Sequence, residues 1–297
     1  MKLSDIYIRD PFILPYNGKY YLYGTNAALT WVSGQYGFDC WVSEDLINWS
    51  EPIKCFEAPE GFWANETFYA PEVHIYNGEF YMFASFGAKV GCFRASQILK
   101  ASNPEGPFEV WSTPITPAHQ PCIDATLHIE NGTPYAIYCH ETIDIENKDG
   151  EILCVELTKD LKKPVGEHKI LFTASEPAWT AYKKSLDEPP IFVTDGPFMH
   201  RSKDGKLLML WASHYGPDQY IEVVSYSENG SLFGEWKHSE NVLYLNDGGH
   251  GMLFKTFDGQ LMFTLHAPNR PTNAETPILF KVEETNHDPF LKLTPFE

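Results

Sequence analysis

Short runs of aromatic and β-branched residues, separated by turns that contain glycine, recur along the whole chain. Helical periodicity is almost absent, so the hydrophobic pattern predicts strands rather than helices. Several turns read Asn-Gly or Asp-Gly, which is the sequence chemistry of tight β-hairpins. We therefore expect an all-β protein.

Five of the hairpins share one phrase: a polar residue, an apolar strand, a turn with glycine and a second apolar strand. Their turn glycines are Gly18, Gly78, Gly132, Gly205 and Gly259, spaced by 60, 54, 73 and 54 residues. Further strand-like segments follow the first, third and fourth hairpins, as in WVSEDLINWSEP at 41–52. A repeated hairpin with outer strands is typical of radial blades.

This pattern predicts a five-bladed β-propeller that forms a single domain over residues 1–297. A β-sandwich with a similar number of strands is the alternative. A sandwich would not need the same hairpin phrase five times, so the propeller is favoured.

A polar residue stands at the head of each expected inner strand: Asp10, Glu72, Asp124, Asp195 and His250. The innermost strands of a propeller line its axis, so equivalent positions in different blades should converge. We therefore expect four carboxylates and one imidazole to gather in one funnel.

Carboxylates held close together in a partly desolvated pocket have pKa values that are pushed apart. Glycoside hydrolysis needs such a set, with one carboxylate ionised and another protonated. The alternative is that these residues only cap turns. Asp10 and Asp124 stand in short distinctive phrases at the same repeat position, which favours a catalytic role.

Composition narrows the classes of partner. The chain has 22 Lys and Arg against 40 Asp and Glu, a net charge of −18 that argues against nucleic acid and anionic lipid. There is no apolar run of about 18 residues, so no membrane partner is expected. The first residues lack an apolar signal region, which predicts a cytoplasmic protein. The six cysteines have no metal-finger spacing and are expected to be buried, reduced thiols.

Five short motifs, in order, resemble the glycoside hydrolases of family 43. They are RDPF at 9–12, APEV at 70–73, CIDATL at 122–127, DGPF at 195–198 and GHG at 249–251. The resemblance spans about residues 5 to 284. It implies a five-bladed propeller that hydrolyses arabinose- and xylose-containing saccharides with inversion.

By this resemblance Asp10 is the general base, Asp124 orients the acid and tunes its pKa, and Asp195 is the general acid. The family usually has Glu before Gly-Pro, and this chain has Asp195, which is shorter by one methylene. Two other carboxylates lie nearby in the sequence, Glu188 and Glu141. Glu141 ends the second strand of the third hairpin, so we expect it to face away from the inner rim.

The resemblance also implies a histidine near the propeller axis, His250, beside a bound calcium or other ion. Calcium prefers oxygen ligands, so water would complete its shell; a histidine held by hydrogen bonds without metal is the alternative. No cofactor is expected for the chemistry itself. His266 and Arg270 are expected to face the pocket, with a surface role as the alternative for Arg270. Trp63 and Phe68 are candidate sugar-stacking residues, with core packing as their alternative.

The sequence thus predicts an inverting glycosidase that acts on the ends of oligosaccharides and is similar to an α-L-arabinofuranosidase or a β-xylosidase. One alternative is a catalytically impaired propeller that binds a glycan. Another is a related propeller glycosidase for galactosides or fructosides. The sequence does not indicate an oligomeric state.

Overall fold

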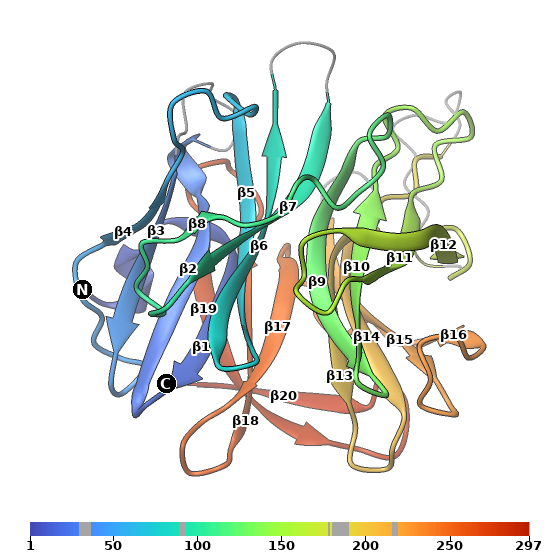
Figure 1. Cartoon of the computed structure of the whole chain (residues 1–297). Helices are drawn as coiled ribbons and strands as arrows, with labels where there is room; N and C mark the ends of the chain where they lie inside the picture. The colour runs from blue at the N-terminus through green and yellow to red at the C-terminus, as the bar shows by residue number, and fades with distance from the viewer. Residues whose placement is uncertain (30–36, 89–92, 178, 180–189, 216–218, 297) are drawn as a thin grey trace.

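The computed structural model of the chain is a ring of five four-stranded antiparallel sheets (Figure 1). It describes residues 1–29, 37–88, 93–177, 179, 190–215 and 219–296. Each sheet consists of four strands that follow one another along the chain. The predicted all-β class and the five-bladed propeller are confirmed.

The blades follow the sequence in order. Blade 1 contains β1 (Ile8–Tyr16), β2 (Lys19–Asn26), β3 (Gly37–Ser43) and β4 (Ile53–Glu57). Blade 2 contains β5 (Thr67–Tyr76), β6 (Glu79–Gly87), β7 (Arg94–Ala101) and β8 (Glu109–Val110). Blade 3 contains β9 (Cys122–Glu130), β10 (Thr133–His140), β11 (Glu151–Leu157) and β12 (Pro164–Thr173).

Blade 4 contains β13 (Asp195–Arg201), β14 (Leu207–Tyr215), β15 (Gln219–Ser227) and β16 (Trp236–His238). Blade 5 contains β17 (Gly249–Lys255), β18 (Leu261–Ala267), β19 (Thr276–Glu284) and β20 (Leu291–Pro295). Two single-turn 3₁₀ helices flank the first hairpin, η1 (Leu3–Asp5) and η2 (Ala27–Leu29). No helix in the described part of the chain is long and apolar enough to cross a membrane.

The first strand of each blade lies at the centre of the ring, where β1 contacts β5 and β17 and β13 contacts β9 and β17. The hairpins that join these strands to their neighbours are the ones that the turn glycines predict. In the three Asn-Gly turns both residues have positive φ, for example Asn17 at +48° and Gly18 at +78°. Asparagine and glycine tolerate this conformation, and such turns match the twist of the strands they join.

Every inner strand carries a β-bulge near its start, where the register with the second strand shifts. One residue of each bulge has positive φ: Asp10, Ala70, Asp124, Gly196 and His250. Left-handed backbone is unfavourable for most residues with a side chain, and bulges near active sites serve to redirect side chains. The bulges therefore turn two carboxylates and one imidazole toward the axis at the same level.

Four apolar clusters fill the spaces between neighbouring blades. One cluster joins Tyr23 of blade 1 and Phe86 of blade 2 to Met252 and Phe254 of blade 5, so the first and last blades share a core. The five described cysteines are buried and form no disulfide, as expected: Cys40, Cys55, Cys122, Cys139 and Cys154. Cys92 lies outside the described residues.

Candidate active site

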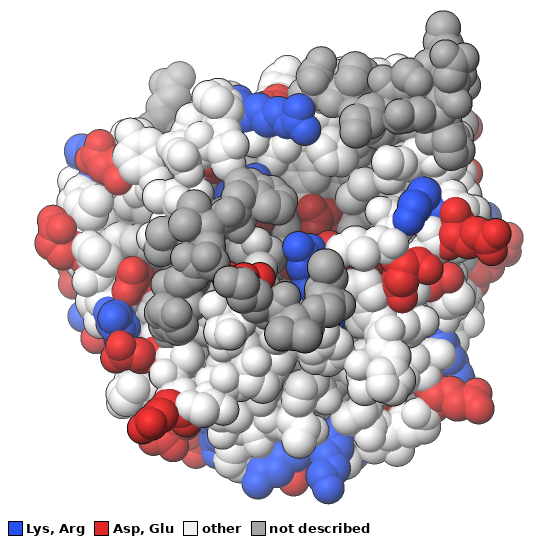
Figure 2. Space-filling model, turned by 90° about the horizontal axis from the view of Figure 1, so that it is seen from above, with Lys and Arg blue, Asp and Glu red and all other residues white. Residues whose placement is uncertain are grey.

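All five blades contribute to a cavity of about 190 Å³ at the ends of the inner strands where the bulges lie. Seen from above, the molecule is hollowed near its centre, and acidic and basic side chains are visible in the hollow (Figure 2). The lining residues are Arg9, Asp10, Tyr69, Arg94, Ile123, Asp124, Glu141, Thr142, Val193, Thr194, Asp195 and His250. The structure therefore brings the three predicted catalytic carboxylates and His250 together.

Asp10 is fixed from three sides. Its Oδ1 lies 3.2 Å from Nδ1 of His250, and its Oδ2 accepts a 2.5 Å hydrogen bond from the Thr25 hydroxyl. Its backbone N–H donates to Nδ1 of His266 at 3.2 Å. Burial alone would raise the pKa of Asp10, but the charge of His250, its hydrogen bond and the charge of Arg9 hold the pKa far below its usual value. Asp10 is thus ionised at neutral pH.

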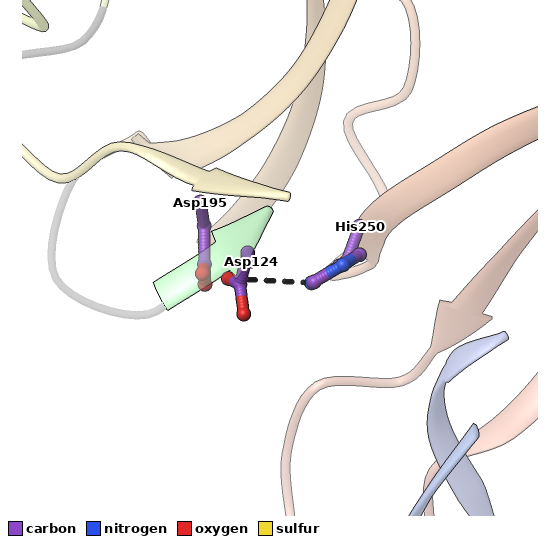
Figure 3. Close-up of side chains that lie close together, drawn as sticks. All are labelled: Asp124, Asp195 and His250. Carbon is purple, nitrogen blue, oxygen red and sulfur yellow. Dashed lines mark ion pairs between the residues drawn. The ribbon is translucent and has the colours of Figure 1, made fainter. Parts of the chain in front are cut away.

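His250 lies between two of the predicted catalytic carboxylates. Its Nδ1 is 3.2 Å from Oδ1 of Asp10 and 3.9 Å from Oδ2 of Asp124. Figure 3 shows the contact with Asp124. Burial lowers the pKa of this imidazole, but the charge of Asp10, its hydrogen bond and the charge of Asp124 raise it to about 10. A Cβ on Gly196 would lie 2.5 Å from the imidazole ring. Glycine at this bulge position therefore lets the backbone of blade 4 pack directly against His250.

Asp124 and Asp195 form a coupled pair, in which Asp195 also accepts a 2.6 Å hydrogen bond from the Tyr220 hydroxyl. Burial and the neighbouring charge of Asp195 raise the pKa of Asp124 well above its usual value. Burial opposes ionisation of Asp195 too, yet the hydrogen bonds from Asp124 and Tyr220 and the charge of His250 lower its pKa. The opposite shifts indicate that the pair holds one proton at neutral pH.

Glu141 lines the same cavity, which corrects the expectation that it faces away from the rim. It follows directly after β10, and its Oε1 accepts a 2.6 Å hydrogen bond from Arg94 at the start of β7. Its Oε2 is buried and has no hydrogen-bond partner among the described residues. Burial raises the pKa of Glu141 to about 7 although the charge of Arg94 opposes the shift. The other spare carboxylate, Glu188, lies outside the described residues.

The expected register of the inner strands was wrong in two blades. The residues equivalent to Asp10 are Ala70 in blade 2 and Gly196 in blade 4, each with positive φ. Asp195 therefore stands one position earlier and still reaches the cavity. Glu72 stands two positions after Ala70, where it pairs with His74 at 3.0 Å and does not line the cavity. The position of a side chain relative to the bulge therefore decides whether it reaches the cavity.

The four predicted sugar-contacting residues, unlike the three predicted catalytic carboxylates, do not line the cavity. Phe68 and His266 are both 0% exposed, so the predicted contact with substrate is wrong for these two residues. Phe68 packs in the aromatic core of blade 2, while His266 stacks on Tyr220 and holds the backbone of Asp10. Trp63 donates to Gln97 at 2.6 Å and is not part of the cavity lining. Arg270 is exposed and also lies outside that lining.

The sequence did not point to several residues that shape the site. Arg94 and Tyr220 occur at ordinary strand positions, with no motif around them, whereas Tyr69 stands directly before APEV and lines the cavity. Arg9 belongs to the RDPF motif, but only the structure shows its guanidinium 3.1 Å from the buried carboxylate of Glu275. These contacts join different blades, so local sequence carries no signal for them.

Several carboxylates around one small cavity, with pKa values shifted in opposite directions, are typical of a glycosidase site. The chain matches the family described as "Glycosyl hydrolases family 43" over residues 5–287. No curated protein matches it. Among solved structures, an endo-arabinase from Bacteroides thetaiotaomicron is 35% identical with a TM-score of 0.86, and the match covers 96% of this chain and 98% of that one.

An endo-1,4-beta-xylanase from the same organism is 25% identical with a TM-score of 0.75, over 98% of this chain and 95% of that one. A thermostable family-43 glycoside hydrolase, 24% identical with a TM-score of 0.81 over 98% of this chain and 93% of that one, shares the fold. The chain belongs to glycosyl hydrolase family 43. It is a glycoside hydrolase that cleaves O-glycosidic bonds of oligosaccharides with inversion.

Proposed function

We propose that the protein releases arabinose from the ends of arabinose-containing oligosaccharides, with xylose-containing oligosaccharides as the second candidate. The observation that carries the proposal is the convergence of Asp10, Asp124 and Asp195 on one small cavity. The similar endo-arabinase supports arabinose, and the similar xylanase supports the second candidate.

The size of the cavity supports action at chain ends. Its volume of about 190 Å³ is below the roughly 300–1,000 Å³ of pockets that enclose drug-sized ligands. A space of this size suits one sugar ring rather than a run of several. Arg9 and Arg94 in the lining offer hydrogen bonds to sugar hydroxyls.

In the proposed mechanism Asp10 accepts a proton from the water that attacks the anomeric carbon. Its low pKa makes it a weak base, so catalysis depends on its position, which Thr25, His250 and His266 fix. Inversion requires the acid and the base to stand about 6.5–9.5 Å apart so that water fits beside the sugar. The family position assigns the acid to Asp195, within the Asp124–Asp195 pair.

Substitution of the base tests this function. Asp10→Asn keeps the shape of the side chain and tolerates the positive φ of +52° at this bulge. We expect kcat on arabino-oligosaccharides to fall by at least about 10³-fold. The melting temperature should also fall, because His250 and Arg9 lose a compensating charge, so activity is compared at a temperature where both proteins are folded. A panel of nitrophenyl glycosides with NMR of the product anomer measures both sugar and stereochemistry. If the unmodified protein binds these sugars in calorimetry but hydrolyses none, it is a glycan-binding propeller instead.

We also propose a calcium ion beside His250, which the family resemblance implies. The residues fit at one atom: Nε2 of His250 is buried and has no hydrogen-bond partner among the described residues, so it could bind the ion in place of a proton. Oxygen ligands from water would complete the shell, and the ion would supply positive charge near Asp10. We expect a chelator to lower the melting temperature and added calcium to restore it. Equal melting curves with chelator and with calcium would count against the ion.

A further inference from the structure

We infer that Glu141, rather than Asp195, is the general acid that protonates the leaving oxygen of the glycosidic bond. This rests on the proposed hydrolytic function and names a catalytic residue outside the family's motif position. Glu141 comes from the end of β10 in blade 3 and lines the cavity with Asp10 and Asp195.

Asp195 is poorly placed to give up a proton. Its Oδ2 already accepts the Tyr220 hydroxyl at 2.6 Å, and it takes a further hydrogen bond from Asp124. Hydrogen bonds donated to a carboxylate stabilise the ionised form. Asp195 is also one methylene shorter than the glutamate usual at this position, so it extends less far toward a sugar.

Glu141 has the properties that Asp195 lacks. Its Oε2 is buried without a hydrogen-bond partner among the described residues, and a bare carboxylate oxygen in that state is costly. A proton on Oε2 relieves this cost. Because Oε2 is buried, the carboxyl group has to turn when a sugar binds, so that the glycosidic oxygen can accept this proton. Burial and the charge of Asp195 raise the pKa of Glu141 to about 7, against the opposing charges of Arg94 and His140. A general acid works best with a pKa near the operating pH.

The proton transfers balance across the reaction. The Oε2 proton of Glu141 moves to the glycosidic oxygen as the bond from that oxygen to the anomeric carbon breaks, and the bonding electrons stay on the oxygen. Water attacks the anomeric carbon from the opposite face and gives its proton to Asp10. Arg94, 2.6 Å from Oε1, stabilises the carboxylate that Glu141 becomes. Exchange of one proton with solvent restores both residues.

The test compares leaving groups. A dinitrophenyl glycoside needs almost no acid assistance, whereas an oligosaccharide needs full assistance. We expect Glu141→Gln to lower kcat/KM for the oligosaccharide by about 10²–10⁴-fold and for the dinitrophenyl glycoside by less than tenfold. The basic limb of the pH profile, near pH 7 in the unmodified enzyme, should disappear in this variant. Asp195→Asn should lower kcat/KM for both substrates to a similar degree.

Glu130→Gln is the matched control, because Glu130 is a partly buried carboxylate at the far end of β9, outside the cavity. This substitution should leave kcat/KM unchanged for both substrates. If Glu141→Gln does not fold, Glu141→Asp can replace it, because it keeps the carboxyl group but shortens the side chain. Glu141→Asp should also lower kcat/KM more for the oligosaccharide than for the dinitrophenyl glycoside, by a smaller factor. The inference is overturned if the loss of kcat/KM is larger for the oligosaccharide than for the dinitrophenyl glycoside in Asp195→Asn but not in Glu141→Gln. Absence of hydrolysis in the unmodified enzyme would instead overturn the proposed function.

Discussion

At the scale of single residues, the site depends on buried charges that neighbours hold in unusual protonation states. His250 is charged because three carboxylates surround it, whereas His266 is neutral because burial and the charge of Arg9 lower its pKa to about 3. The two histidines that contact Asp10 therefore have different charge states and different roles. His250 compensates the charge of Asp10, and neutral His266 accepts the backbone N–H of Asp10.

Glu222 offers a prediction at this scale. It is fully buried beside the site, its Oε2 accepts the backbone N–H of Gly251 at 3.1 Å, and its Oε1 has no partner among the described residues. Burial raises its pKa to about 8, against the opposing charge of His250. The folded state therefore holds a proton that the unfolded state releases near pH 4.5, so stability falls as pH rises toward 8.

Glu222→Gln should remove this dependence, because the amide is neutral at every pH. Between pH 6 and pH 8 we expect the unmodified protein to lose about 2 kcal/mol of unfolding free energy relative to the variant. Urea denaturation at several pH values measures the difference. Glu60→Gln, at an exposed carboxylate, should follow the unmodified protein. Parallel curves for Glu222→Gln and the unmodified protein would refute the prediction.

At the scale of elements, the hairpins were predictable and the bulges were not. A hairpin is specified by a few adjacent residues, and Asn17-Gly18 carries the turn by its own backbone preference. A bulge is a shift of one strand against another, and nothing in APEV or DGPF marks where it falls. For this reason Asp10, Asp124 and His250 were predicted at the correct level of the inner strands, while Glu72 was not.

The predicted site was likewise correct for residues that the repeat positions and wrong for residues whose position depends on packing. Carboxylates at strand heads could be predicted because the repeat places them at one end of the axis. Aromatic contacts could not, because Phe68 and an exposed aromatic residue have the same sequence signature, and only packing decides between them. Glu141 was misjudged because Arg94, which is distant in sequence, binds it in the cavity lining.

At the scale of the whole molecule, the ring closes by side-chain contacts. Each blade consists of consecutive strands, so no strand passes from the end of the chain into the first blade. Among the described residues, blade 1 meets blade 5 through the shared apolar cluster and through two buried ion pairs, Asp10 with His250 and Arg9 with Glu275. Glu275 is 0% exposed and lies in the loop before β19. The Arg9–Glu275 pair thus links ring closure to a residue of the cavity.

This arrangement predicts a measurable contribution of the pair to stability. Glu275→Gln keeps the shape of the side chain but leaves the charge of Arg9 without its closest partner in blade 5. Asp10 and Asp195 still compensate part of that charge, so we expect a loss of about 2 kcal/mol, less than the 3–5 kcal/mol for a fully uncompensated buried charge. Urea denaturation measures the loss.

Two comparisons separate the ion pair from a general effect of substitution. In a double-mutant cycle with Arg9→Met, the second substitution should cost at least about 1 kcal/mol less when Glu275 is already replaced, because residues in contact are coupled. Glu57→Gln removes an exposed pair with Lys54, 3.7 Å apart in blade 1, and should cost less than about 0.5 kcal/mol because water screens it. Equal losses for Glu275→Gln and Glu57→Gln would show that closure rests on the contacts of β1 with β17 alone.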